Sequence, residues 1–225
     1  MESSLHRALK RRYGEGGRTE VWINGFRVDA VSAEGAVIEV QSGPLAPLRA
    51  KLGRLLTGRS VSVVKPVVCR RRVVRRTTPD GADVSARMSP KRGVLADVFD
   101  DLVGLARVFP HPNLTIEVLG VAIDEVRVPR RRWPGYSVAD RLLHEVLEQV
   151  TLREPADLWR LLPFRPREPF TTRDVAQRLG RSTSLAQRVA YCLLHSGAIE
   201  EVGKQGNRRV FVLAGTRGPA LPTKG

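Results

Sequence analysis

The sequence predicts an α/β protein in which a mixed sheet flanked by helices is followed by a helical connector and a small C-terminal helix-turn-helix unit. Three strand-like segments, 20–23, 26–31 and 36–41, are joined by turn signals and lie between two segments with helical periodicity. Residues 60–67 are nearly continuous valine, which is typical of a strand buried on both faces. Residues 170–213 combine two helical segments, a glycine turn and a hairpin.

The N-terminal elements follow from local patterns. Residues 2–13 predict a helix because Leu5 and Leu9 are four apart, which places both on one face together with Glu2. Asn24-Gly25 and residues 33–35 are turn signals, so the three strands form an antiparallel meander. The remaining predicted elements are a helix at 45–56, a strand at 60–67 continuing through 70–77, a helix at 94–108, a strand at 114–123, connecting helices at 136–149 and 155–162, helices at 172–179 and 183–195, and strands at 198–202 and 208–213.

The Arg130–Arg132 run and Pro134-Gly135 are interpreted as the exit from the first domain. The predicted divisions are a sheet domain at 1–135, a helical connector at 136–168, a helix-turn-helix unit at 169–214 and a disordered tail at 215–225.

The charge of the chain favours a polyanionic partner. Lys and Arg number 38 against 23 Asp and Glu, a net charge of +15. The pI is near 11.1. A solvated basic surface is the alternative explanation. Neither cysteine nor any of the four histidines shows the spacing of a zinc site, and no run approaches the roughly 18 apolar residues of a membrane span. We therefore expect no membrane association and a cytoplasmic location.

The register of the hairpin between residues 26 and 41 follows from its loop. A three-residue loop at 33–35 pairs Ser32 with Ala36 and sets Ala30 opposite Ile38. The same register places Asp29 across from Glu39 on the other face.

Two opposed carboxylates repel each other across a hairpin. A divalent cation such as Mg²⁺ bound between Asp29 and Glu39 would offset that repulsion, because hard cations take carboxylate oxygens. Glu2 is a candidate for a third oxygen. The alternative is that Arg27 or another basic side chain bridges the pair.

These residues resemble the core of the PD-(D/E)xK, or restriction-endonuclease-like, nucleases. The resemblance covers residues 2–67: a helix with Glu2, then Val28-Asp29, then Glu39-Val40-Gln41, a helix and a valine-rich strand. It implies a restriction-endonuclease-like sheet, and it implies that Mg²⁺ or Mn²⁺ is held by Glu2, Asp29, Glu39 and the main chain of Val40. The family's catalytic lysine is replaced here by Gln41, so Lys65 or Lys51 would have to supply that charge.

The C-terminal unit resembles a winged helix-turn-helix, whose second helix enters the major groove of DNA. A basic loop before the predicted helix at 94–108 is a candidate phosphate site. The predicted DNA-binding residues are Lys91, Arg92, Arg181, Ser182, Thr183, Ser184, Gln187, Arg188, Lys204 and Arg208.

The sequence thus predicts a metal-dependent DNA endonuclease, and the resemblance also allows a homodimer. Two alternatives stay open: a catalytically inactive nuclease-fold DNA-binding regulator, which Gln41 favours, and an adaptor whose basic faces meet an acidic protein.

Overall fold

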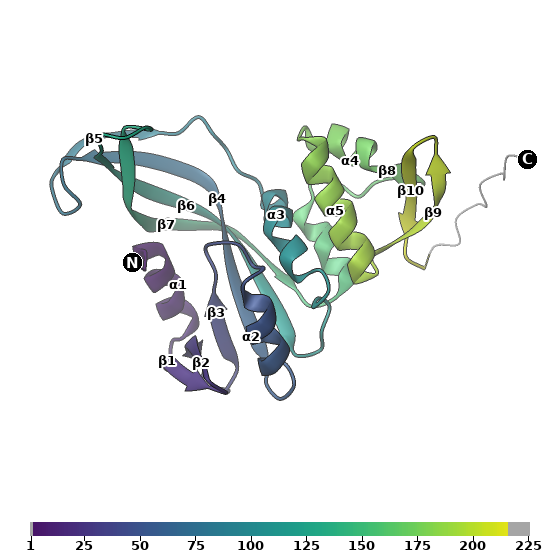
Figure 1. The fold of residues 1–225 in the computed structure, drawn as a ribbon, viewed down its shortest axis with the longest axis horizontal. Helices are drawn as coiled ribbons and strands as arrows, with labels where there is room; N and C mark the ends of the chain where they lie inside the picture. Colours follow the sequence, from purple (N-terminus) through teal and green to yellow (C-terminus); the bar gives the residue numbers. More distant parts are fainter. Residues whose placement is uncertain (1, 216–225) are drawn as a thin grey trace, which may run out of the picture.

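The protein is a mixed α/β structure, and the computed structural model describes residues 2–215 (Figure 1). The first unit contains α1 (Ser4–Tyr13), β1 (Arg18–Ile23), β2 (Phe26–Val31), β3 (Val37–Val40), α2 (Leu48–Leu55), β4 (Val61–Arg76), β5 (Asp83–Met88), η1 (Leu95–Val98), α3 (Phe99–Leu102), η2 (Val103–Leu105), β6 (Leu114–Pro129) and β7 (Tyr136–Leu152). The second contains η3 (Pro155–Leu161), β8 (Phe170–Thr171), α4 (Thr172–Leu179), α5 (Thr183–Ser196), β9 (Ile199–Gln205) and β10 (Arg208–Leu213).

A seven-stranded mixed sheet forms the first unit. Its order is β1-β2-β3-β4-β6-β7, with β5 paired to the outer part of β4. β4 runs parallel to both β3 and β6, and the other neighbours are antiparallel. Pro66 lies in this central strand although proline has no backbone N–H to donate. It is tolerated because the ladder between β3 and β4 ends at the Val40–Val64 pair, so no β3 carbonyl needs a donor from Pro66.

Helices cover both faces of the sheet. Leu5 and Leu9 of α1 pack in one apolar cluster with residues of β3, β4 and β6, and Leu52 of α2 packs in a separate cluster on the opposite face. The predicted meander and its register are confirmed: Ala30 pairs with Ile38, and the Ser32 N–H donates to the Ala36 carbonyl at 2.9 Å.

The predicted connecting helix at 136–149 is wrong, since these residues form strand β7. β7 pairs antiparallel with β6 over almost its whole length, from Ile116–Leu152 to Pro129–Tyr136. The Arg130–Arg132 run and Pro134-Gly135 form the tight connection between β6 and β7 and do not leave the domain. The predicted domain end at 135 is therefore also wrong, and the sheet unit extends through β7.

The predicted helix at 94–108 is a chain of short helical turns, η1, α3 and η2. Gly104 lies against Ala46, and a β-carbon added there would stand 2.6 Å from the Ala46 nitrogen. Gly104 therefore leaves room for the loop before α2 to approach this segment closely.

The second unit contains two helices and a three-stranded sheet of order β8-β10-β9. Its apolar residues, among them Leu158, Val189 and Phe211, belong to the same core cluster as Phe99 and Leu102 of the first unit. The two units therefore share one core. Of the predicted tail, residues 216–225 lie outside the described residues.

Candidate functional site

Two acidic side chains lie where the β2–β3 ladder ends. The ladder pairs Ala30 with Ile38 and Val31 with Val37. Beyond this point Asp29 Oδ2 accepts a hydrogen bond from the Val40 N–H at 2.8 Å. The Asp29 carboxylate thus binds a main-chain donor next to Glu39, and the two acidic residues are neighbours.

Asp29 and Glu39 nevertheless turn toward different helices. His6 Nε2 of α1 lies 3.2 Å from Asp29 Oδ1, and Lys51 Nζ of α2 lies 2.5 Å from Glu39 Oε1. The expectation that both side chains share one face is therefore wrong. β1 is irregular at this level: Thr19 pairs with Ala30 and Val21 with Val28, whereas Glu20 between them has a left-handed φ of 57°. This break lies opposite Asp29.

Arg27, the predicted bridging residue, is bound elsewhere. Its Nε lies 2.5 Å from Glu20 Oε2, and Glu20 also pairs with Lys10. The cations that contact the two central carboxylates are His6 and Lys51. The signal for His6 in the sequence is its position four residues after Glu2, which places both on one helix face; Glu2 Oε1 lies 3.3 Å from His6 Nε2.

The surroundings shift the pKa values of the two carboxyl groups in opposite directions. Burial alone would raise the pKa of Asp29, but the hydrogen bonds from His6 and from the Val40 N–H outweigh it and leave the pKa lowered. Burial raises the pKa of Glu39 despite Lys51. The hydrogen bond to Asp29 in turn raises the pKa of His6. Neighbouring carboxyl groups with divergent pKa values are a common feature of functional sites.

The other predicted catalytic residues lie around this pair. Glu2 precedes the N-cap Ser3, and its carboxylate also contacts Lys10 Nζ at 2.8 Å. Gln41 Nε2 donates to the Pro44 carbonyl at 2.9 Å and so holds the loop after β3.

Lys65 is buried and has partners of its own. Its Nζ lies 2.8 Å from Asp101 Oδ2 and donates to the Gly43 carbonyl at 2.6 Å. The structure therefore brings Lys51, and not Lys65, to Glu39.

The donor set suits a hard cation in part. Asp29 and Glu39 provide two neighbouring carboxylates, the ligand type that Mg²⁺ takes. Within residues 2–215 no group of three or more His, Cys, Asp or Glu side chains is arranged to hold an ion. Glu2, the proposed third ligand, is engaged by His6 and Lys10 in this arrangement.

In the second unit a groove of about 670 Å³ lies between α5 and the β9–β10 hairpin. Thr183, Gln187 and Arg208, all predicted DNA-binding residues, line it. Arg173 and Asn207 add further polar groups. The predicted residues Ser184 and Lys204 are exposed, whereas Ser182 caps α5 by accepting from the Leu185 N–H at 3.3 Å.

Arg181 and Arg188 are directed toward the first unit. Arg188 Nη1 lies 2.9 Å from Asp100 Oδ1, and Arg181 Nη2 lies 3.8 Å from Asp97 Oδ2 and donates to the Arg92 carbonyl at 3.2 Å. In this structure acidic groups of η1 and α3 bind these two arginines, and their contact with DNA stays a prediction.

Lys91 and Arg92 are exposed in the loop before η1. The predicted phosphate site at a helix start is not formed there, because η1 has only four residues and Asp97 Oδ2 already accepts from the Val94 N–H at 2.9 Å.

Comparison with known proteins shows the family to which the first unit belongs. Residues 3–153 match the model of a domain of unknown function, DUF8091. The chain belongs to the DUF8091 family. It is also 33% identical over 181 residues to a protein of Treponema pallidum (strain Nichols) named "Uncharacterized protein", an alignment that covers 78% of this chain and 72% of the relative. No solved structure matches.

The DUF8091 match begins one residue before α1 and ends directly after β7. It therefore contains the whole seven-stranded sheet and the Asp29–Glu39 pair. The α5 groove lies outside the matched span. None of the helices in residues 2–215 of this DUF8091 protein combines the length and apolar character needed to cross a bilayer.

Proposed function

We propose that this DUF8091 protein is a metal-dependent DNA endonuclease whose C-terminal unit positions the DNA. The order α1-β1-β2-β3-α2-β4, with β4 parallel to β3, supports this proposal. It agrees with the restriction-endonuclease-like resemblance of residues 2–67, with Asp29 on the second strand and Glu39 on the third.

The position of Lys51 carries the proposal. A nuclease of this kind needs a cation beside the acidic pair, and Gln41 cannot provide one. Lys51 Nζ lies 2.5 Å from Glu39 Oε1 and donates to the Arg27 carbonyl at the same distance. The α2 helix thus supplies the positive charge that the third strand lacks.

Asp29 and Glu39 would hold the divalent cation only after Asp29 is released from His6 and Glu39 from Lys51, so that both carboxylates turn to one ion. Glu2 would enter after release from His6 and Lys10. A cation held there would lower the pKa of a bound water and would stabilise charge on the phosphoryl oxygens. The Lys51 ammonium group would attract the scissile phosphate and the attacking water from its position beside Glu39. His6 keeps Asp29 ionised through their hydrogen bond. The groove along α5, with Arg173 and Arg208, suits the phosphates of a duplex.

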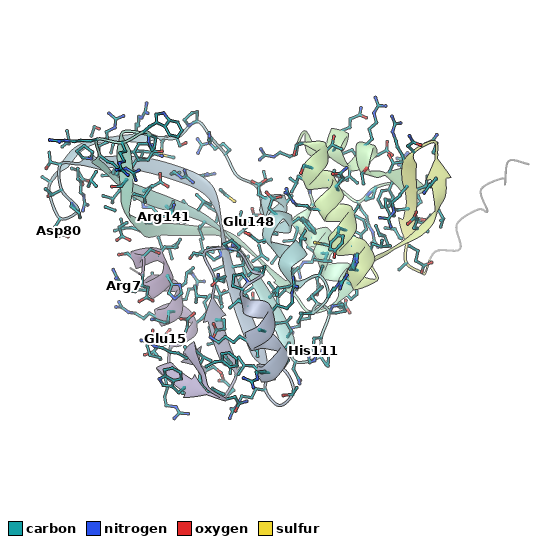
Figure 2. All side chains as sticks on the ribbon, viewed as in Figure 1. Arg7, Glu15, Asp80, His111, Arg141 and Glu148 are labelled. Atoms are coloured by element: carbon teal, nitrogen blue, oxygen red, sulfur yellow. The ribbon has the colours of Figure 1, made fainter. Side chains whose placement is uncertain are left out.

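Cleavage of linear, branched and single-stranded DNA with Mg²⁺ or Mn²⁺ tests the proposal. Wild type is compared with the site variants Asp29→Asn, Glu39→Gln and Lys51→Met. Glu15→Gln serves as a matched control, because Glu15 is an exposed carboxylate in the turn after α1 (Figure 2). We expect the three site variants to lose metal-dependent cutting and the control to keep it, with circular dichroism verifying that all are folded. Equal cutting by every variant contradicts the proposal.

The second candidate is a DNA-binding regulator that does not cut. The ion pairs of Asp29 with His6 and of Glu39 with Lys51 favour it, because they neutralise the carboxylates without a metal. Two results together would favour the regulator. The wild type would bind DNA in a salt-dependent way without cutting it, and isothermal titration calorimetry would detect no binding of Mn²⁺.

A further inference from the structure

The outer ends of β4–β7 form an arm that extends away from α5 (Figure 1). We define the arm as residues 70–88 and 124–141; Figure 2 shows Asp80 at its far end and Arg141 closer to the body. The arm contains eleven arginines, no lysine and five carboxylates. The arginines are Arg70, Arg71, Arg72, Arg75, Arg76, Arg87, Arg127, Arg130, Arg131, Arg132 and Arg141.

The carboxylates of the arm neutralise only some of these arginines. Glu125, which is 2% exposed, contacts Arg71, Arg127 and Arg141, while Asp124 pairs with Arg72. Arg76 pairs with Asp83 at 2.7 Å. The remaining six have no ion pair among the described residues: Arg70, Arg75, Arg87, Arg130, Arg131 and Arg132.

Two of the unpaired arginines line a groove of about 510 Å³ in the arm. The register places Arg75 of β4 directly opposite Arg127 of β6, and Arg87 of β5 opposite Val73. Glu125 already neutralises Arg127, so Arg75 and Arg87 are the two lining arginines that have no ion pair among the described residues. Their positive charge favours a bound anionic group in the groove.

Aromatic side chains lie beside this positive charge. Tyr136 lines the groove, and the guanidinium carbon of Arg127 lies 3.9 Å from the centre of its ring. Trp133 directly precedes Pro134, another lining residue, and is 90% exposed. An indole so exposed has an open face for stacking.

We propose that the arm binds single-stranded nucleic acid, with Arg75 and Arg87 on phosphates and Trp133 stacked on a base. Proteins bind a single strand with positive side chains along its phosphate backbone and with aromatic side chains that stack on its bases. A duplex keeps its bases stacked inside and offers Trp133 no free base face. The groove has the volume of a small-molecule site, which suits nucleotides of one strand better than the width of a duplex.

The inference adds a second surface to the proposed function and does not depend on cleavage. Binding is therefore measured in EDTA, by fluorescence anisotropy of labelled oligodeoxythymidylate and of a labelled duplex over a range of salt concentrations. Failure of cutting leaves this measurement unaffected.

The expected result separates stacking from charge. Trp133→Ala weakens binding to the single strand by about fivefold or more and leaves its salt slope unchanged. Trp133→Phe restores most of the affinity, because phenylalanine also stacks. Combined Arg75→Ala and Arg87→Ala lowers the slope of log affinity against log salt by about 1.4, since each phosphate contact of a single strand contributes about 0.7.

Trp22→Ala is the matched control, because Trp22 is also exposed, at 71%, but lies on β1 away from the arm. We expect it to bind like wild type. Unchanged single-strand affinity of Trp133→Ala, or an equal loss for the duplex, overturns the proposal, provided that circular dichroism shows the variant to be folded.

Discussion

Asp29 and His6 form a contact whose strength depends on pH. The pKa of His6 is raised, so its contribution to stability is complete below the ordinary histidine value of 6.5 and is lost as pH rises through the folded pKa. The pKa of Asp29 is lowered, so its contribution is present above 3.8 and is lost as pH falls through the folded pKa. Both groups are charged between these two values.

We therefore expect His6→Asn to reduce the free energy of unfolding by about 1 kcal/mol between pH 3.8 and 6.5, and by less at higher pH. Urea denaturation of both proteins across this range measures the difference. A deficit that grows above pH 6.5 contradicts the assigned ion pair.

Lys51 compensates a carboxylate whose side chain is only 7% exposed. Lys51→Met leaves Glu39 without its cation, so the pKa of Glu39 rises further and the loss of stability increases as pH rises above 4.5. We expect a loss of about 2 kcal/mol at neutral pH, below the range for fully buried pairs because Lys51 is 15% exposed. The measurement is urea denaturation at acidic and neutral pH.

The control for that prediction removes both charges. Lys51→Met combined with Glu39→Gln regains much of the stability at neutral pH, because no buried carboxylate is left uncompensated. A double variant as unstable as Lys51→Met shows that packing, and not charge, sets the effect.

At the site, the sequence predicted the contact within the β2–β3 hairpin but not the contacts that the helices make with it. The three-residue loop fixes the register that brings Asp29 near Glu39. No local pattern shows that Glu20 breaks β1 opposite Asp29, or that Lys51 of α2 reaches Glu39. Such contacts depend on how helices pack on the two faces of the sheet.

Among the elements, α4 depends on a capping box. Asp174 Oδ2 accepts from the Thr171 N–H at 2.7 Å and from Thr171 Oγ1 at 2.8 Å, which satisfies free donors at the start of the helix. Asp174→Ala should cost about 1 kcal/mol of stability. Chemical denaturation measures it against Gln177→Ala, an exposed position of the same helix; equal effects of the two variants contradict a capping role.

Strand β7 shows where element prediction failed. Val138, Leu142 and Val146 are spaced by four, which is close to one helical turn but is also an even number that keeps residues on one face of a strand. Local spacing therefore permits both structures. Pairing with β6 along nearly the whole strand decides the outcome, and this long-range ladder is invisible in residues 136–149 alone.

At the scale of the whole molecule, the apolar core crosses the boundary of the DUF8091 match. Phe99 of α3 and Val189 of α5 belong to one buried cluster, and Arg188 and Asp100 join the same elements at the surface. The shared cluster and this ion pair connect the C-terminal groove to the sheet unit, as the proposed endonuclease function requires.

A shared core predicts that both units unfold in one cooperative transition. Trp159 reports on the second unit, because it is 8% exposed and its ring packs edge-on against Phe170, with the ring centroids 6.3 Å apart. In a variant with Trp22→Phe and Trp133→Phe, tryptophan fluorescence comes from Trp159 alone, whereas far-ultraviolet circular dichroism is sensitive to the sheet as well. We expect coincident urea midpoints, and Asp174→Ala should shift both signals equally. A fluorescence transition that precedes the loss of ellipticity would mean that the C-terminal unit unfolds independently and that its groove moves relative to the acidic pair.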